Sequence, residues 1–229
     1  MNENWQNVLI EKFPIIFQDR YASPSESCLA FGVECGPGWF NILDVLFEEI
    51  TAFCEKTGFP CPKALQIKEK FGTLCVYMDL TEDYIGGLIS MAESLSGMVC
   101  ETCGKPGITV GYRAGWLKTR CLEHGGNPEI DKPAKVEKKG KVSRTIHMDE
   151  PYVIERRVPA CTKSGESITI LDALNICLVS YCEWKEGADV RISEVRIEDG
   201  RLVFESQGAD DYARGLMAMA GAFWKRSNP

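Results

Sequence analysis

Two pairs of metal-binding residues constrain this chain more than any other feature of its sequence. Cys100 and Cys103 flank two residues, and Cys121 and His124 repeat that spacing after seventeen intervening residues. A gap of two residues lets both side chains of a pair reach one ion, and structural zinc sites take four such ligands in a tetrahedron. Gly104 follows the first pair, where a tight turn favours a residue without a Cβ. We therefore predict one structural Zn²⁺ ion, bound by these two pairs.

The segment between the two pairs has the pattern of a zinc ribbon. Ile108–Arg113 and Trp116–Arg120 are predicted strands, and Ala114-Gly115 breaks the pattern between them. All four ligand positions are filled, so no position is left for a catalytic water. The alternative is a set of unconnected buried cysteines, which the paired spacing disfavours. Closed zinc sites mostly hold folds together, and we expect that role here.

The composition is that of a globular protein in a reducing compartment. The chain has 229 residues, of which 45% are hydrophobic, and eleven of them are cysteines. Met1–Trp5 has neither the basic start nor the apolar stretch of a signal peptide. No run approaches the roughly 18 apolar residues of a membrane-spanning helix. We therefore expect a cytoplasmic protein without a membrane segment, most of whose other cysteines are buried rather than disulfide-bonded.

The net charge of −7 is unevenly distributed along the chain. Residues 1–100 carry −8, residues 101–163 carry +5 and residues 164–229 carry −4. An acidic front, a basic middle and an acidic rear indicate at least two modules around a basic centre. From Asn127 to about Ser143 the chain is rich in Pro, Lys and Glu, which is typical of a linker or an exposed arm.

Hydrophobic periodicity predicts a helix, a hairpin and a second helix in each half of the chain. In the first half these are a helix from Trp39 to about Gly58, strands within Leu65–Met78, and a helix over about Thr81–Ser96. In the second half they are a helix over Ile168–Trp184, strands at Val190–Ile197 and Leu202–Glu205, and a terminal helix carrying Tyr212 and Phe223. We find no residue pattern shared by the two halves, and so predict no internal repeat.

The predicted fold class is therefore α+β, with two small helix–hairpin–helix modules joined by a zinc ribbon. The predicted domains are the N-terminal α+β module at 1–98, the ribbon at 99–127, a basic linker at 128–150 and the C-terminal α+β module at 151–229. The helix at Ile168–Trp184 is apolar on nearly every side and must be buried on every side. We predict that a homodimer through the C-terminal module supplies this cover. Burial against the N-terminal module is the alternative.

Residues for catalysis are scarce in this sequence. There are two histidines, and if His124 binds zinc then His147, in a predicted loop, is left alone for acid–base work. Neither a phosphate-cradling loop nor the glycine pattern of a dinucleotide site occurs. Adjacent carboxylates such as Asp149-Glu150 are typical of solvated faces or helix starts. We therefore predict no catalytic residues and a protein that is not an enzyme.

The basic middle of the chain allows two interpretations. Its cations could follow a phosphate backbone while ribbon aromatics stack on bases. The candidate residues for nucleic-acid binding are Tyr112, Arg113, Trp116, Lys118, Arg120, Lys138, Lys139, Lys141 and Arg144. The other interpretation is a solvated linker, and Glu129, Asp131 and Glu137 favour it because they dilute the positive charge.

Three segments carry a resemblance to a known family. They are Gly38-Trp39-Phe40, the run Lys68-Glu69-Lys70-Phe71-Gly72-Thr73-Leu74, and Cys100-Glu101-Thr102-Cys103-Gly104. In this order they resemble a family of uncharacterised phage and prophage proteins, over about residues 28–126. The resemblance implies a phage setting, in which small accessory proteins without catalytic residues often act by binding host machinery, including defence systems.

Three functional hypotheses follow. The favoured one, which rests on the resemblance, is a phage-type accessory protein in the host cytoplasm that binds and inhibits or redirects a host factor. That factor would be a protein or a protein–nucleic-acid complex, and it could belong to antiviral defence. The second hypothesis is a nucleic-acid-binding regulator that uses the zinc ribbon and the basic arm. The third and weaker one is a nucleotide sponge or an enzyme with a pocket between the modules.

Overall fold

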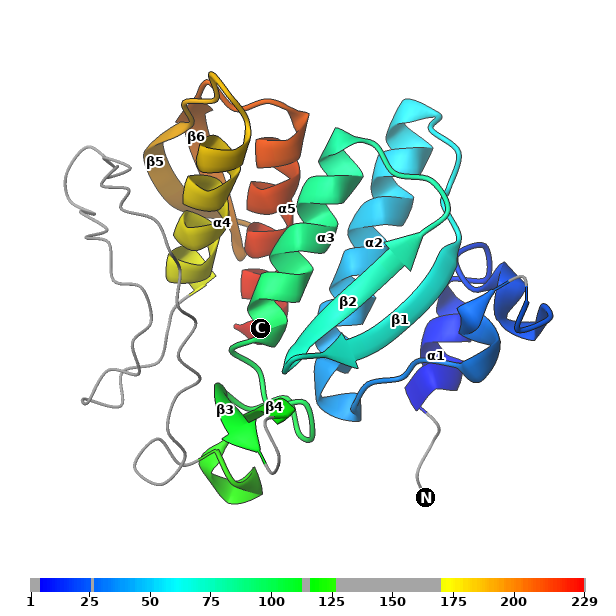
Figure 1. Ribbon diagram of the computed structural model, residues 1–229. Coiled ribbons are helices and arrows are strands. Elements are labelled where there is room, and N and C mark those ends of the chain that lie inside the picture. Colours follow the sequence, from blue (N-terminus) through cyan, green and yellow to red (C-terminus); the bar gives the residue numbers. More distant parts are fainter. Residues whose placement is uncertain (1–4, 26, 113–115, 127–169, 229) are drawn as a thin grey trace.

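A computed structural model describes residues 5–25, 27–112, 116–126 and 170–228 of the chain (Figure 1). It confirms a mixed α+β fold, with antiparallel hairpins as the sheets of the described part. The first elements are α1 (Trp5–Lys12), α2 (Phe40–Thr57), β1 (Ala64–Lys70), β2 (Thr73–Met78) and α3 (Asp83–Ser96). They are followed by β3 (Ile108–Tyr112), β4 (Trp116–Arg120), α4 (Ile170–Trp184), β5 (Arg191–Glu198), β6 (Arg201–Gln207) and α5 (Asp211–Ser227). The predicted linker at 128–150 lies outside the described residues.

The helices begin and end at the residues that local chemistry favours. α2 follows a 3₁₀ turn at Pro37–Trp39 and ends at Gly58, which adopts a left-handed conformation with a φ of 75°. This is the glycine cap that the sequence predicts, because glycine has no Cβ to oppose a positive φ. α3 and α5 each start after an acidic residue whose carboxylate accepts a backbone N–H of the first turn, Glu82 and Asp210 respectively.

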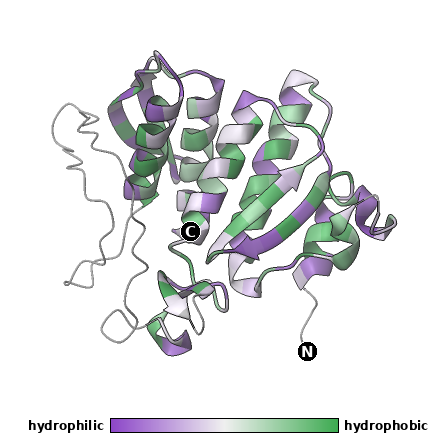
Figure 2. Cartoon of the chain, in the orientation of Figure 1, coloured by the Kyte–Doolittle hydropathy of each residue, from purple (hydrophilic) through white to green (hydrophobic). Residues whose placement is uncertain are grey.

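Helices α2, α3, α5 and α4 lie side by side, and each of the larger hairpins packs next to one of them (Figure 1). The β1–β2 hairpin contacts α3, and the β5–β6 hairpin contacts α5. Hydrophilic residues concentrate in β1, while hydrophobic residues run along β2 and the helices (Figure 2). Buried apolar residues from both halves form one continuous core. In the described part of the chain, no helix has the length and apolarity needed to cross a bilayer.

The two halves share a residue pattern at a constant separation of 128 positions, so the prediction of no internal repeat is wrong. The first repeat runs from α2 to α3, and the second runs from α4 to α5. Both contain a β-bulge, at Ala64/Gln66 and at Ile192/Glu194. In both, the two residues of the hairpin turn have positive φ, namely Phe71-Gly72 and Asp199-Gly200. Identical residues in the closing helices are Asp83/Asp211, Tyr84/Tyr212, Gly87/Gly215, Leu88/Leu216, Met91/Met219 and Ala92/Ala220.

The two repeats meet where α3 and α5 cross, and the contact is reciprocal. A Cβ on Gly87 would lie 2.0 Å from the carbonyl oxygen of Tyr212, and a Cβ on Gly215 would lie 2.1 Å from that of Tyr84. The helices run in the same direction in Figure 1. Equivalent residues therefore exchange equivalent contacts, as in a symmetric dimer of parallel helices, and only glycine allows the two backbones to come this close.

A stacked pair of aromatic rings repeats on either side of this crossing. Phe53 of α2 stacks on Tyr84 with ring centroids 4.7 Å apart and an interplanar angle of 15°. Tyr181 of α4 stacks on Tyr212 with a separation of 4.6 Å and an angle of 18°. Each stack ties the first helix of a repeat to its last helix. The repeat is therefore defined by contacts that recur in both halves of the chain as well as by sequence spacing.

Helix α4 finds much of its cover inside the same chain. It packs against both α5 and α3, and its buried residues are Ala173, Leu174, Leu178 and Tyr181. Because α3 belongs to the N-terminal half, part of α4 is buried against that half, as the alternative prediction expects. Trp184, at the end of α4, is 80% exposed. A homodimer through this half stays a prediction.

Replacing Gly215 with alanine should destabilise the protein. The new Cβ would meet the Tyr84 carbonyl, so the helices must separate, which we expect to lower the free energy of unfolding by about 1–3 kcal/mol. Gly86→Ala is the matched control in the same crossing, because its Cβ would lie 3.5 Å from the Tyr212 ring, an ordinary contact. The control should be neutral or stabilising by up to about 1 kcal/mol. Urea denaturation compares them, and equal midpoints for both variants would contradict the close crossing.

Candidate metal centre

The four predicted ligands lie together at the end of α3. Their ligand atoms are all within 4.8 Å of one another. Cys103 Sγ and Cys121 Sγ are 3.7 Å apart, and His124 Nδ1 lies 3.2 Å from Cys121 Sγ and 3.6 Å from Cys100 Sγ. Four ligands around one Zn²⁺ at the usual bond lengths would be separated by about 3.5–3.8 Å. The geometry is therefore compatible with a tetrahedral Cys₃His site, and three thiolates suit zinc as a borderline-soft ion.

The first cysteine of the site is prepared to act as a thiolate. Cys100 is buried, which by itself would raise the pKa of its thiol. Backbone N–H groups of Cys121, Thr102 and Cys103 donate to its sulfur and outweigh that effect, so the pKa falls to about 6. The thiolate is the form that ligates metal.

The backbone of this site is hydrogen-bonded to the loop that precedes α2. Gly38 N donates to the carbonyl of Glu101 at 2.8 Å, and Gly36 N donates to Glu101 Oε1 at 3.1 Å. The indole of Trp39, fully buried, donates to the Val99 carbonyl at 2.8 Å. A Cβ on Gly38 would lie 2.1 Å from the Cys100 carbonyl, so that position requires glycine.

The tip of the β1–β2 hairpin is fastened to the same site through the β3–β4 hairpin. Thr119 Oγ1 donates to the Gly72 carbonyl at 2.6 Å, and Gly72 N donates to Glu69 Oε1 at 2.7 Å. A Cβ on Gly72 would lie 2.7 Å from the Thr109 side chain. The three segments that carry the family resemblance thus meet at one place, around the four ligands.

Two of the predicted nucleic-acid contacts are engaged in ion pairs within the protein. Lys118 pairs with Glu69 and, at 3.6 Å, with Glu101, while Arg120 lies 3.3 Å from Glu101. Arg120 also donates to Thr102 Oγ1 at 2.6 Å. Sequence reasoning missed both glutamates as part of this site, although each lies inside one of the three resembling segments. The charge of these cations is largely neutralised before any phosphate arrives.

The other candidates for nucleic-acid binding are one exposed aromatic residue and several residues outside the described part of the chain. Trp116 is 67% exposed and free to contact a partner. Tyr112 lies in β3, with its side chain outside the described residues. Arg113 and the cations of the basic arm, Lys138, Lys139, Lys141 and Arg144, also lie outside them, as does His147.

In the part of the chain that the structure describes, this is the one cluster of three or more metal-ligating groups. Comparison with protein-family models, with curated proteins and with solved structures finds no match for this chain. The site must therefore be interpreted from its own chemistry. Four protein ligands leave no coordination position for a substrate or a water, which is the arrangement of a structural metal site.

Removal of one ligand should remove both metal and stability. We expect about one zinc per chain by elemental analysis of protein purified without chelator, and much less in Cys100→Ser. The variant should lose about 3–4 kcal/mol of stability, the contribution of a ligand present at several hundred times its dissociation constant. Cys28→Ser is the control, because Cys28 is exposed and outside the cluster. A wild-type protein that folds with no bound metal would contradict the site.

Proposed function

We propose that this protein is a binding protein rather than an enzyme, and that one structural zinc ion shapes its binding surface. It acts by binding and inhibiting or redirecting a host factor, in the phage setting that the sequence resemblance implies. A closed set of four ligands supports the structural role of the metal. Hydrogen bonds join this site to the loop before α2 and to the tip of the β1–β2 hairpin. These bonds support a role for the site in holding a binding surface in place.

The observation that carries this proposal is the conformation of Phe71. It has a φ of 55° and is 69% exposed, at the tip of the β1–β2 hairpin. A bulky residue in this region is strained by about 1–2 kcal/mol, and its ring gains little from burial here. The equivalent position of the second repeat holds Asp199, which tolerates the same turn more easily. A strained and exposed aromatic residue beside a rigid metal centre points to a contact made with a partner.

A second exposed aromatic residue lies at the neighbouring hairpin. Trp116 begins β4 and precedes Leu117, whose backbone lies against Gly72 beside Phe71. Aromatic anchors of this kind dominate the energy of many protein–protein interfaces. The surface around Phe71 and Trp116 is therefore the part of the described chain that best suits a host protein.

Trp116 also favours the alternative of a nucleic-acid-binding regulator, since exposed aromatic rings stack on unpaired bases. The pairing of Lys118 and Arg120 with Glu69 and Glu101 speaks against it, because affinity for nucleic acid depends on free cations. We therefore place the host protein first. Treatment of the captured complex with nuclease separates the two, since a nucleic-acid-mediated complex would dissociate.

Phe71→Asn separates binding from folding. Asparagine tolerates a left-handed conformation, so the variant should keep its metal and be as stable as the wild type or slightly more so. We expect it to lose most of the partner captured by tagged, zinc-loaded wild-type protein from infected host cells, as measured by quantitative mass spectrometry.

Tyr21→Ala is the control for this experiment. Tyr21 is also an exposed aromatic residue, but it lies in the N-terminal 3₁₀ turn Gln18–Tyr21. Its removal should leave capture unchanged. Equal capture by Phe71→Asn and by the wild type would contradict the proposed surface. A loss of stability in Phe71→Asn would instead give Phe71 a structural role.

A further inference from the structure

The first repeat covers the free edge of its hairpin with its own side chains. On β2, Leu74 N donates to Ser96 Oγ at 2.7 Å and Val76 N donates to Glu93 Oε1 at 3.0 Å. Both acceptors belong to α3, the helix that follows the hairpin. An exposed strand edge is a template for another strand, and these two bonds occupy it.

The second repeat has lost both acceptors. The residues equivalent to Leu74 and Val76 are Leu202 and Phe204, and the matching register of the two hairpins directs their N–H groups away from β5 in the same way. The residues equivalent to Glu93 and Ser96 are Gly221 and Trp224, neither of which carries an acceptor. Within the described residues, no group accepts a hydrogen bond from the N–H of Phe204.

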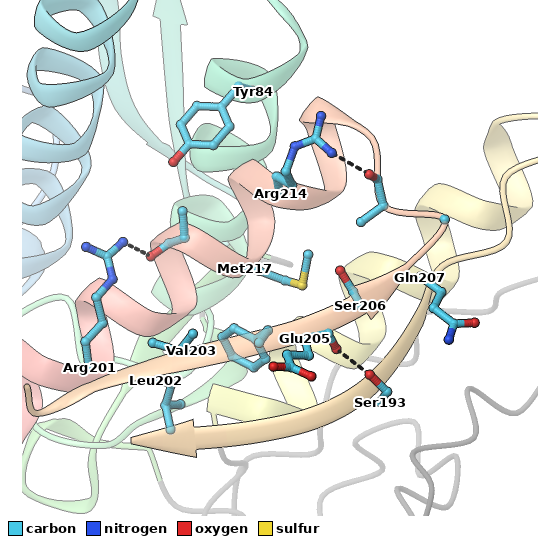
Figure 3. Close-up of a pocket in the computed structure, with 14 residues that line it drawn as sticks. Tyr84, Ser193, Arg201, Leu202, Val203, Glu205, Ser206, Gln207, Arg214 and Met217 are labelled. Atoms are coloured by element: carbon cyan, nitrogen blue, oxygen red, sulfur yellow. Dashed lines mark hydrogen bonds between the residues drawn. The ribbon is translucent and has the colours of Figure 1, made fainter. Parts of the chain in front are cut away.

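A groove of about 800 Å³ opens at this uncovered edge (Figure 3). It runs between β6 and α5, with Ser206 on one side and Arg214 and Met217 on the other, and it reaches Tyr84 of α3. Here too the repeats differ. Tyr212 of the second repeat donates to Ser90 Oγ of the first repeat at 2.7 Å, whereas Ala218 stands in the second repeat at the position equivalent to Ser90. The hydroxyl of Tyr84 makes no hydrogen bond within the described residues and is available to a ligand.

We propose that this groove binds an extended, acidic peptide segment of a partner protein, whose carboxylate takes the place that Glu93 fills in the first repeat. The chain itself shows that a carboxylate is a suitable acceptor at this position of the hairpin edge. Arg201 and Arg214 also line the groove, but each is already paired with a carboxylate of the chain, Glu49 and Asp211 respectively, so the preference for a carboxylate rests on the N–H of Phe204. The main chain of the extended segment would lie alongside β6, so that its side-chain carboxylate reaches the N–H of Phe204.

This surface lies on the second repeat, apart from the metal centre and Phe71. The inference therefore goes beyond the proposed function and holds whether or not Phe71 contacts a host factor. The ligand is a peptide segment with a carboxylate, and no nucleotide or catalytic step is involved.

The test is a ¹⁵N chemical-shift titration of the full, zinc-loaded chain with two end-blocked hexapeptides, one alternating Thr and Glu and the other alternating Thr and Lys. We expect the acidic peptide to shift the amide signals of Phe204 and Ser206 saturably. Arg214→Glu should weaken this binding by about tenfold, because it reverses a charge in the groove. Lys225→Glu is the matched control, an exposed cation on the same helix outside the groove, and should bind as the wild type does.

Several results would overturn the assignment. They are no shift at Phe204 with the acidic peptide, equal shifts with both peptides, or unchanged affinity in Arg214→Glu. A single-stranded oligonucleotide or a nucleotide added in place of the peptide should leave the Phe204 amide unmoved, and saturable binding there would reassign the groove. Because each variant is compared by its own amide spectrum, a variant that does not fold is recognised directly. The comparison of the acidic and basic peptides on the wild-type protein then tests the proposal without any variant.

Discussion

The contact on which the rest of this structure depends is the backbone crossing of α3 and α5. Gly87 and Gly215 remove the side chains that would otherwise hold the helices apart. At such short range each helix becomes part of the core of the other repeat. Two arginines of the second half form ion pairs with the first half beside the crossing, Arg201 with Glu49 at 2.7 Å and Arg226 with Glu48 at 2.8 Å and with the buried Asp44. These ion pairs contribute to stability only because the helices are already aligned. Otherwise the entropy of ordering the long side chains would offset most of the attraction.

The metal centre breaks the symmetry that this crossing creates. It follows α3 in the chain, between the two repeats, but the described contacts of its backbone are with the first repeat, through Gly38, Trp39 and Gly72. The first repeat thus gains a rigid attachment at its hairpin tip, which can hold Phe71 in a strained conformation. The second repeat, with Asp199 at that tip, needs no such support. The same arrangement of elements therefore carries two different surfaces.

Much of the fold and the four metal ligands could be predicted from the sequence, because both depend on local spacing. The hairpin turn at Asp199-Gly200 and the cap at Gly58 follow from backbone preferences of single residues. The pairing of Lys118 with Glu69 could not be predicted, since 49 residues separate them and only the fold brings them together. The repeat was missed for another reason. Its identical residues are scattered among exchanged ones such as Val76 and Phe204, although the run Ile42-Leu43-Asp44 recurs as Ile170-Leu171-Asp172.

The positions where the repeats differ most are the informative ones. Packing alone constrains Gly87 and Gly215 to stay alike, whereas nothing in the crossing requires Glu93 and Gly221 to differ. A Cβ at Gly221 would lie 2.2 Å from the Leu202 carbonyl, so β6 approaches α5 too closely there for any side chain to cover the edge. The groove opens farther along the strand, toward Phe204 and Gly208. The missing acceptor and the open groove are therefore both linked to the close approach of β6 to α5 at Gly221.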